Sequence, residues 1–281
     1  MSDFTDTEEI FDGPPPLAAG QQLAPGYEVI AHMRRGNNLD IYDVWSEERA
    51  CRCIAKTLRP DCLAHKDTVR RLFWEGRLLK RFTHPHIARA YEVLKEPRPV
   101  MIQETLTGAT LAYLIDTSPR RLALSDAVNL GIHLCSAVQY LHRPNVLHLD
   151  LKPSNIVSER QLAKVLDLSI ARSPGRGRKG AGTLQYMAPE QVLGGFLSPA
   201  TDVWGIGAVL FEATTGEEPF NADDEDDDEP GYEQTERRIS PVRSHRRVPV
   251  RFANLVESCL EPDPAQRPTV QELMKALTAY S

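Results

Sequence analysis

Between residues 27 and 103 the hydrophobic positions recur in short runs, as is typical of strands. Residues 41–45 and 51–55 alternate in polarity, and residues 46–49 between them have the character of a turn, which predicts two paired strands. Residues 100–102 form a short apolar run that indicates a buried strand. One helix is expected in this part, over residues 68–82, because apolar side chains recur there at helical spacing.

After Gly108 the pattern changes to that of helices. A long helix is expected over residues 127–141, with Ser125 as its N-cap. Further helical patterns cover residues 200–215, 252–260 and 270–277. A small strand-rich unit followed by a larger helical unit predicts an α+β chain, with a ligand site in a cleft between its two parts.

Two segments depart from these patterns. Residues 1–25 contain three consecutive prolines, several acids and few aromatic residues, which favours a flexible tail. Residues 223–229 are seven consecutive acids within an expected acidic loop, 221–231. Such blocks are usually solvated, and the alternative is a docking surface for a basic partner. Without these acids the net charge of −6 would be close to zero, so the composition does not call for nucleic acid as a partner.

Cysteine usage and hydropathy indicate the compartment. The five cysteines are an odd set without regular spacing, and Cys51 and Cys53 lack the further ligands that a zinc site needs. We expect reduced thiols and, because no signal peptide is recognisable, a cytoplasmic location. The longest apolar stretch, residues 203–213, is shorter than the roughly 20 residues that span a bilayer, so no membrane-spanning segment is expected.

One short region is dense in chemically useful side chains. Residues 148–155 read His-Leu-Asp-Leu-Lys-Pro-Ser-Asn, and Asp167 follows 12 positions after Asn155. Asp150 offers a proton acceptor, Lys152 a cation, and Asn155 and Asp167 two oxygen ligands for a metal. Together they supply what the transfer of a phosphoryl group to a hydroxyl requires. The alternative for Asp150 is a loop carboxylate that caps a turn.

Residues 27–279 resemble the eukaryotic-like Ser/Thr protein kinase family, in a compact form similar to its bacterial members. Besides the region just described, the resemblance rests on motifs that occur in the family's order. These are Ile54-Ala55-Lys56, Glu75, Gln103 as the gatekeeper, Glu104 to Gly108 as the hinge, Gly182-Thr183, Ala188-Pro189-Glu190, Asp202 to Gly205, and Arg267.

The resemblance implies a bilobal protein-kinase-like fold, with a small antiparallel sheet and one main helix in the N-lobe and a mostly helical C-lobe. After the tail 1–25, the kinase domain would cover residues 26–281. Its N-lobe would comprise 26–103, its hinge 104–107 and its C-lobe 108–281.

The resemblance also implies the cofactors ATP and Mg²⁺, or Mn²⁺ in its place. Lys56 would bind the α and β phosphates, and Glu75 would hold Lys56 in an ion pair. Asp150 would accept the hydrogen bond of the incoming hydroxyl as catalytic base, and Lys152 would steady the transferred group. Asn155 and Asp167 would bind the metal.

The nucleotide would be bound by residues from both lobes, and Glu190 and Arg267 would form a partly buried ion pair that anchors the activation segment. The expected nucleotide-binding residues are Gly36, Ile41, Ala55, Lys56, Gln103, Glu104, Leu106 and Val157.

Three features depart from the family pattern. Only Gly36 remains of the three glycines of the phosphate-covering loop, a loss that can weaken nucleotide binding about tenfold. Leu149 replaces an arginine that pairs with an activation-loop phosphate in many relatives, so we predict a loop that orders without phosphorylation. Ser169 stands where glycine is usual, and its Cβ should restrict the backbone flip that inactivates many kinases.

The function expected from this resemblance is transfer of the ATP γ-phosphate to Ser or Thr of protein substrates, with the chain itself among the candidates. Lysine at position 152 and Gly182-Thr183 favour Ser/Thr over Tyr. The alternative is a pseudokinase that binds nucleotide or acts as a scaffold, which the degenerate loop favours. A small-molecule phosphotransferase is a third reading, and Ala188-Pro189-Glu190 and Gly182-Thr183 disfavour it.

Overall fold

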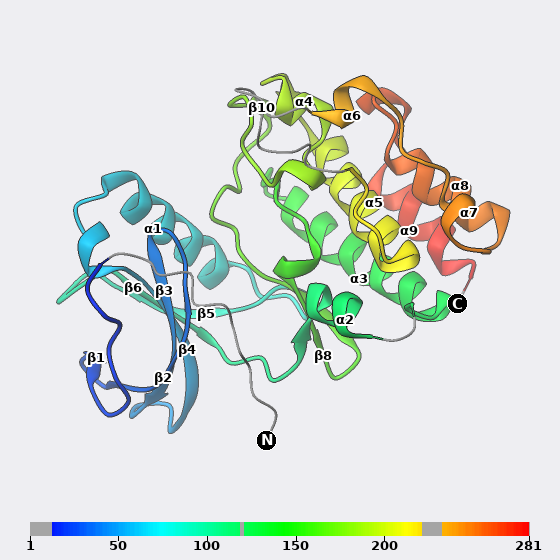
Figure 1. The fold of residues 1–281 in the computed structure, drawn as a ribbon. Helices are drawn as coiled ribbons and strands as arrows, with labels where there is room; N and C mark the ends of the chain where they lie inside the picture. Colours follow the sequence, from blue (N-terminus) through cyan, green and yellow to red (C-terminus); the bar gives the residue numbers. More distant parts are fainter. Residues whose placement is uncertain (1–12, 119–120, 221–231, 281) are drawn as a thin grey trace. The chain divides into compact units, whose positions relative to one another are not determined.

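The computed structural model describes residues 13–118, 121–220 and 232–280. The chain divides into two compact units (Figure 1). Unit 1 comprises Met1–Lys80 and Arg89–Thr105, and unit 2 comprises Arg81–Ala88 and Leu106–Ser281. The last boundary between them, after Thr105, falls inside the segment 104–107 in which the sequence predicts a hinge, whereas residues 81–88, predicted as part of the N-lobe, belong to unit 2.

Unit 1 is built on a six-stranded antiparallel sheet with the strand order β1-β2-β3-β4-β6-β5. In the described residues of this unit, one α-helix accompanies the sheet, α1 (Lys66–Arg81), preceded by a 3-10 turn at Pro60–Cys62. The strands are β1 (Gln22–Ala24), β2 (Tyr27–Arg35), β3 (Leu39–Ser46), β4 (Cys51–Leu58), β5 (Ala90–Leu94) and β6 (Val100–Glu104).

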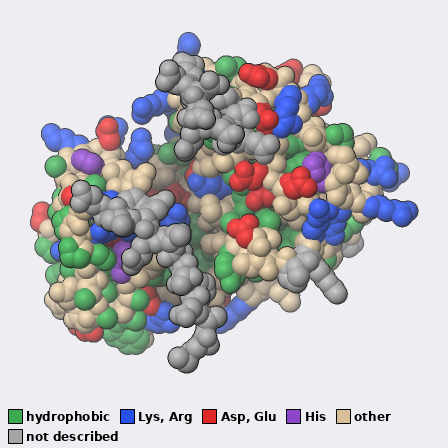
Figure 2. Space-filling view, viewed as in Figure 1, with side chains coloured by type: hydrophobic (Ala, Val, Ile, Leu, Met, Phe, Trp, Pro, Cys, Tyr) green, Lys and Arg blue, Asp and Glu red, His purple; other side chains and the backbone are tan. Residues whose placement is uncertain are grey.

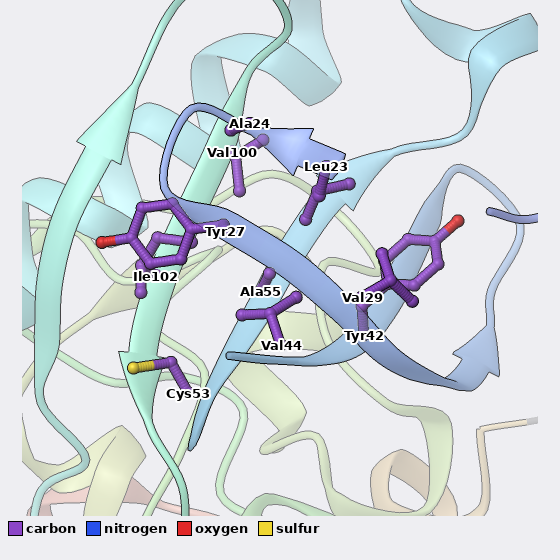
Figure 3. Close-up of a cluster of buried hydrophobic side chains, with 10 residues drawn as sticks. All are labelled: Leu23, Ala24, Tyr27, Val29, Tyr42, Val44, Cys53, Ala55, Val100 and Ile102. Atoms are coloured by element: carbon purple, nitrogen blue, oxygen red, sulfur yellow. The ribbon is translucent and has the colours of Figure 1, made fainter. Parts of the chain in front are cut away.

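The alternating pattern of the sequence explains how this sheet is packed. Strands β3 and β4 pair from Leu39↔Leu58 to Ser46↔Cys51, which confirms the predicted strand pair. Because side chains alternate between the two faces of a strand, Tyr42 and Val44 lie on the same face as their partners on β4. This face forms a buried apolar cluster (Figure 3). Its members are Leu23, Ala24, Tyr27, Val29, Tyr42, Val44, Cys53, Ala55, Val100 and Ile102.

The interpretation of residues 1–25 as a flexible tail is wrong for the part that the structure describes. Leu23 and Ala24 are only 1% and 2% exposed, and β1 pairs with β2. Leu17 packs against the same cluster, and its backbone N–H donates to the hydroxyl of Tyr42. A few apolar residues in a polar segment are enough to add an edge strand when a partner strand is available. Residues 1–12 lie outside the described part.

Helix α1 turns one face toward the sheet. Its buried residues, Leu72, Glu75, Gly76, Leu78 and Leu79, recur at helical spacing. The helix predicted over 68–82 is therefore confirmed, with bounds one or two residues earlier. Several of its exposed residues are Lys or Arg.

Unit 2 is mostly helical. Helices α3 and α5 lie against each other, and α9 packs against both, so they form the centre of the unit. The α-helices are α2 (Leu111–Thr117), α3 (Leu124–His142), α4 (Pro189–Val192), α5 (Pro199–Thr215), α6 (Glu233–Glu236), α7 (Val242–His245), α8 (Val250–Cys259) and α9 (Val270–Thr278). The strands are β7 (Ala109–Thr110), β8 (Ile156–Glu159), β9 (Leu162–Val165), β10 (Gly175–Arg176) and β11 (Phe196–Leu197).

Local signals set the ends of the central helices. Ser198 caps α5 in a capping box, and Gly216 ends this helix with a φ of +76°, a conformation that suits glycine. The predicted N-cap of α3 is wrong: the helix begins at Leu124 after Ala123, and Ser125 lies within its first turn. The mixed sheet-and-helix architecture agrees with the α+β class expected from the sequence.

All five cysteines are free thiols, and four of them are buried. Within the described residues, none of the helices combines the length and the apolar character that crossing a bilayer requires. The predicted acidic loop, 221–231, lies outside the described residues. A cytoplasmic location remains a prediction.

Candidate active site

In unit 1, Lys56 on β4 and Glu75 on α1 form a buried ion pair. The ammonium lies 3.0 and 2.9 Å from the two carboxylate oxygens, and the side chains are only 10% and 2% exposed. The predicted pair is thus confirmed. Gly76 lets the helix come this close, because a Cβ there would lie 2.3 Å from Cγ2 of Val93 on β5.

The faces of the sheet correct one predicted nucleotide-binding residue. Ile41 on β3 pairs with Lys56, so the two side chains share a face. Ala55 points to the opposite face, where it is fully buried beside Tyr42 (Figure 3). The residue of β4 that shares the face of Lys56 is Ile54, two positions earlier. Ala55 was therefore the wrong choice, and the alternation of the strand is the reason.

The segment with the single glycine joins β2 to β3 and is fastened within unit 1. The Gly36 N–H donates to Leu39 O at 2.8 Å. Arg59 reaches this segment twice: its backbone N–H donates to Asn38 O and its guanidinium to Asn37 O. These hydrogen bonds fix the segment between β2 and β3, which has one glycine where the family pattern has three.

The two arginines before Gly36 differ in their surroundings. Arg34 is exposed. Arg35 donates two hydrogen bonds to Asp40, at 2.9 and 3.0 Å, so its charge already has a partner. Asp40 is buried; burial alone would raise its pKa, but the bonds from Arg35 and His32 bring the pKa below its usual value.

The other predicted nucleotide-binding residues lie on β6, in the segment that follows it and on β8. Gln103 on β6 is half-buried and pairs with Ile54, on the face that carries Lys56. Glu104 accepts a hydrogen bond from the backbone N–H of Arg89 at 2.9 Å. Leu106, half-buried, and Val157, buried on β8, belong to unit 2.

In unit 2, four side chains of the catalytic-loop region and the later Gly182-Thr183 segment form one network. Asp150 accepts from the Thr183 hydroxyl at 2.8 Å and from Nδ2 of Asn155 at 3.0 Å. Lys152 donates to the Thr183 hydroxyl at 2.6 Å and lies 3.2 Å from the carboxylate of Asp150. A carboxylate, an ammonium and a hydroxyl are thus already arranged around a common point.

Asp202 of α5 binds the backbone of the loop 148–155 through hydrogen bonds. Its two carboxylate oxygens accept the N–H groups of His148 and Leu149 at 2.9 and 2.8 Å, and one also contacts His142 at 2.7 Å. Burial would raise the pKa of Asp202, yet the hydrogen bond and charge of His142 keep it below the usual value. This support matters because Leu149 has a φ of +70°, which is strained for a residue with a Cβ.

Asp167 follows β9 and also has a left-handed backbone, with a φ of +54°. Its Oδ1 accepts from the N–H of Ser169 at 2.8 Å. Among the residues with positive φ in the described part, the strained position in this motif is Asp167 and not Ser169. The prediction that Ser169 restricts a backbone flip remains untested.

The segment from 168 to 197 is fixed by apolar and backbone contacts. Leu149 belongs to a buried cluster with Leu147 and with Leu197 of β11, and β11 pairs with β10. Gln191 of α4 adds two hydrogen bonds, to Leu149 O at 2.9 Å and to Ala181 O at 3.0 Å. Many relatives have an arginine at the position of Leu149 that binds a phosphate of the activation loop. In this chain, the apolar packing of Leu149 takes the place of that contact.

Glu190 and Arg267 form the predicted buried ion pair. The guanidinium of Arg267 donates two parallel hydrogen bonds to the carboxylate of Glu190, at 2.7 and 2.9 Å. The side chain of Arg267 is 0% exposed and that of Glu190 is 8% exposed. Arg267 also donates to three backbone carbonyls and lies over the ring of Trp204. This prediction is confirmed.

Comparison with known proteins agrees with this geometry. The family model described as "Protein kinase domain" matches residues 27–277. The chain belongs to the protein kinase family.

Curated serine/threonine kinases of bacteria are similar to this protein kinase domain. A probable serine/threonine-protein kinase of Clostridium perfringens is 26% identical over 88% of the chain and 37% of the relative. Serine/threonine-protein kinase PknB of Mycobacterium leprae is 30% identical over 79% of the chain and 37% of the relative. The chain therefore spans little more than a third of the length of these relatives.

A solved structure shows the same fold. The kinase domain of Mycobacterium tuberculosis PknI, crystallised as a point mutant, matches 94% of this chain and 99% of that one with a TM-score of 0.75. At 20% identity, this likeness concerns the fold of the protein kinase domain alone.

Sequence reasoning missed three side chains of this kinase domain. Ile54 could have been found from the period of its strand. Thr183 was named only as part of the Gly182-Thr183 motif, and its direct bonds to Asp150 and Lys152 were not foreseen, since 31 to 33 residues separate them. Gln191 carries no local signal at all, because its role depends on two carbonyls that only the fold brings near.

A buried carboxyl close to this segment makes the stability of the kinase domain depend on pH. Tyr186 donates to Glu212 of α5 at 2.6 Å. Burial raises the pKa of Glu212 to about 7 although this bond opposes the rise, and the charges of Glu218 and Asp116 add to it. The folded chain thus binds the proton more tightly than the unfolded chain, whose carboxyl has the ordinary value of 4.5.

We expect the contribution of Glu212 to stability to be complete below pH 4.5 and to be lost as the pH rises to about 7. The loss should be on the order of 3 kcal/mol. Glu212→Gln should remove this loss and be more stable than the wild type at pH 8, as measured by urea unfolding at several pH values. Glu236→Gln, an exposed glutamate, is the matched control and should follow the wild type.

Proposed function

We propose that this chain is a Ser/Thr protein kinase that transfers the γ-phosphate of ATP to Ser or Thr hydroxyls of protein substrates, with the chain itself as one candidate. The observation that carries the proposal is the network around Asp150. A carboxylate that already accepts a hydroxyl hydrogen bond, beside an ammonium that contacts the same hydroxyl, is suited to orient an attacking Ser or Thr.

In this proposal Asp150 accepts the hydrogen bond of the substrate hydroxyl and takes its proton as the oxygen attacks. Lys152 stabilises the negative charge of the group in transfer. Thr183 holds both side chains in place, and Asn155 fixes the other carboxylate oxygen of Asp150 through its Nδ2. Lysine at 152 and threonine at 183 support Ser/Thr over Tyr as acceptor, by resemblance to the family.

On the nucleotide side, Lys56 would neutralise charge on the α and β phosphates. Glu75 is needed because a lysine without a fixed partner would sample many rotamers, whereas this ammonium is held by two short contacts. Further contacts to the nucleotide are assigned to Gly36, Ile41, Gln103, Glu104, Leu106 and Val157, with Ile54 in place of Ala55.

The residues present fit a Mg²⁺ or Mn²⁺ ion that is bound together with the nucleotide. The described residues contain no group of three His, Cys, Asp or Glu side chains that could hold a metal without other ligands. Asn155, through its carbonyl oxygen, and Asp167 offer a small set of hard oxygen ligands, which is typical of magnesium shared with phosphates and water. When bound, the ion would neutralise phosphate charge.

Incubation with ATP and Mg²⁺ or Mn²⁺, with and without a generic basic protein, tests the proposal. Mass spectrometry should find phosphoserine or phosphothreonine on the chain or on the added protein. Nucleotide binding without any transfer would instead indicate a pseudokinase. Transfer to aminoglycosides or sugars but not to protein would indicate a small-molecule phosphotransferase.

We expect activity not to require phosphorylation of the exposed Ser173. Ser173→Ala should keep phosphoryl transfer within about twofold of the wild type, because Leu149 and Leu197 hold the segment by packing. Leu149→Ala removes part of that cluster, at about 2–5 kcal/mol for a buried leucine, and should lower activity clearly. Steady-state rates before and after phosphatase treatment measure both effects, and abolished activity in Ser173→Ala would contradict the expectation.

A further inference from the structure

Unit 1 carries a groove of about 630 Å³ along the outer side of α1. Its apolar part is formed by Leu63, Val69, Phe73 and Val93. Its rim carries five cations and no acid: Lys66, Arg70, Arg77, Lys80 and Lys95. In the view of Figure 2, Lys and Arg side chains gather over the part of unit 1 where Figure 1 places α1. We call this surface the α1 groove.

The cations of the α1 groove have few partners inside the fold. Arg70 forms an exposed pair with Asp67, and Arg77 lies over the ring of Trp74. Among the residues that the structure describes, no carboxylate lies within ion-pair distance of Lys66, Lys80 or Lys95. An apolar floor with so much unbalanced positive charge favours an occupant that is both acidic and hydrophobic.

The chain itself contains such a segment, which immediately precedes the described residues in the sequence. Residues 3–12 read Asp-Phe-Thr-Asp-Thr-Glu-Glu-Ile-Phe-Asp, with five acids, three large apolar residues and no Lys or Arg. The described chain begins at Gly13, where a Cβ would lie 3.1 Å from the carboxylate of Asp61. Leu63, the first residue of the groove along the chain, follows two positions later.

The segment is long enough to follow the groove. From Lys66 to Lys80 the helix is roughly 21 Å long at 1.5 Å per residue. Ten extended residues reach about 33 Å. Since Gly13 lies beside Asp61, two positions before the first groove residue, little chain is needed to reach the groove.

We propose that residues 3–12 bind in the α1 groove of the same chain, with their acids on the cationic rim and Phe4, Ile10 and Phe11 on the apolar floor. Because the segment is tethered at Gly13, its effective concentration is of the order of millimolar. A site with an intrinsic Kd of about 0.1 mM would then be occupied about 90% of the time. The opposite face of α1 holds Glu75, so the bound segment would also restrain the helix that supports the pair with Lys56.

Hydrogen exchange of the chain 1–281 tests this inference without any catalytic step, so its result does not depend on the proposed function. Three variants are compared with the wild type at low salt. The segment variant is Phe4→Ser with Phe11→Ser, the groove variant is Arg77→Glu with Lys80→Glu, and the swap adds Glu8→Lys and Glu9→Lys to the groove variant. Arg71→Glu with Arg81→Glu, two exposed cations of α1 outside the groove, is the matched control.

We expect exchange over residues 66–80 to become about tenfold faster in the segment and groove variants, and in 0.5 M NaCl, because opening is no longer opposed by the bound segment. The swap should restore slow exchange, and the control should behave as the wild type. Unchanged exchange in the segment variant would overturn the proposal. So would faster exchange in the groove variant alone, which would mean another occupant such as residues 221–231. A dimer in light scattering that dissociates in the segment variant would show binding between copies and overturn the placement within one chain.

Discussion

Replacing Asp150 by asparagine should lower the rate of phosphoryl transfer by about 10²- to 10⁴-fold, the usual contribution of a general base. Asparagine keeps the size of the side chain and one carbonyl oxygen, so the contact with the Thr183 hydroxyl can persist. What it loses is the negative charge that accepts the substrate proton. The measurement is the turnover number with ATP and a protein substrate, together with nucleotide affinity.

The affinity for ATP should change little in this variant, because the nucleotide contacts are assigned to other residues. Asp126→Asn, an exposed aspartate in the first turn of α3, is the matched control and should keep the wild-type turnover. If Asp150→Asn transferred phosphate at an undiminished rate, the role assigned to Asp150 would be wrong.

Removing the buried guanidinium of Arg267 should have the largest effect on stability. Arg267→Ala leaves Glu190 as a buried carboxylate without its cation and deprives three backbone carbonyls of a donor. Breaking a buried pair in this way costs about 3–5 kcal/mol, a large part of the total stability of a domain. We expect a strongly lowered urea midpoint and, since α4 carries Glu190, a disturbed activation segment.

The control for this change is Arg238→Ala. Arg238 also forms an arginine–carboxylate contact, to Glu261 at 2.7 Å, but its side chain is 71% exposed. A pair in water contributes about 0–1 kcal/mol, so the urea midpoint should hardly move. An equal decrease in the free energy of unfolding in the two variants would show that burial does not set the strength of the ion pair between Arg267 and Glu190.

The parts of the site that the sequence predicted are those with a strong local signal or a strong period. The loop 148–155 packs its functional side chains into eight residues, so their neighbourhood follows from the chain itself. Glu75 lies on the buried face of a clearly amphipathic helix, and this places it opposite the strand that carries Lys56.

Other features could not be predicted from the local pattern of the sequence, or were predicted wrongly. Ala55 was assigned to the nucleotide although the period of two in β4 puts it on the face away from Lys56. Strand β1 has three residues, too few for a period, and it is stable because Leu23 and Ala24 complete a cluster made by other strands. The partners of Thr183 and Gln191 are distant in sequence, so only tertiary structure brings them together.

The leucine cluster at the catalytic loop bears on how such an enzyme would be controlled in a cell. The side chains of Leu147, Leu149 and Leu197 pack together, and we predict that this packing gives the segment its active conformation once the chain has folded. Phosphorylation of this segment by an upstream kinase would then not be needed for activity, and its removal by a phosphatase would not inactivate the enzyme. The rate of substrate phosphorylation in the cell would follow the amount of the kinase and of its substrates, as expected of a constitutively active enzyme.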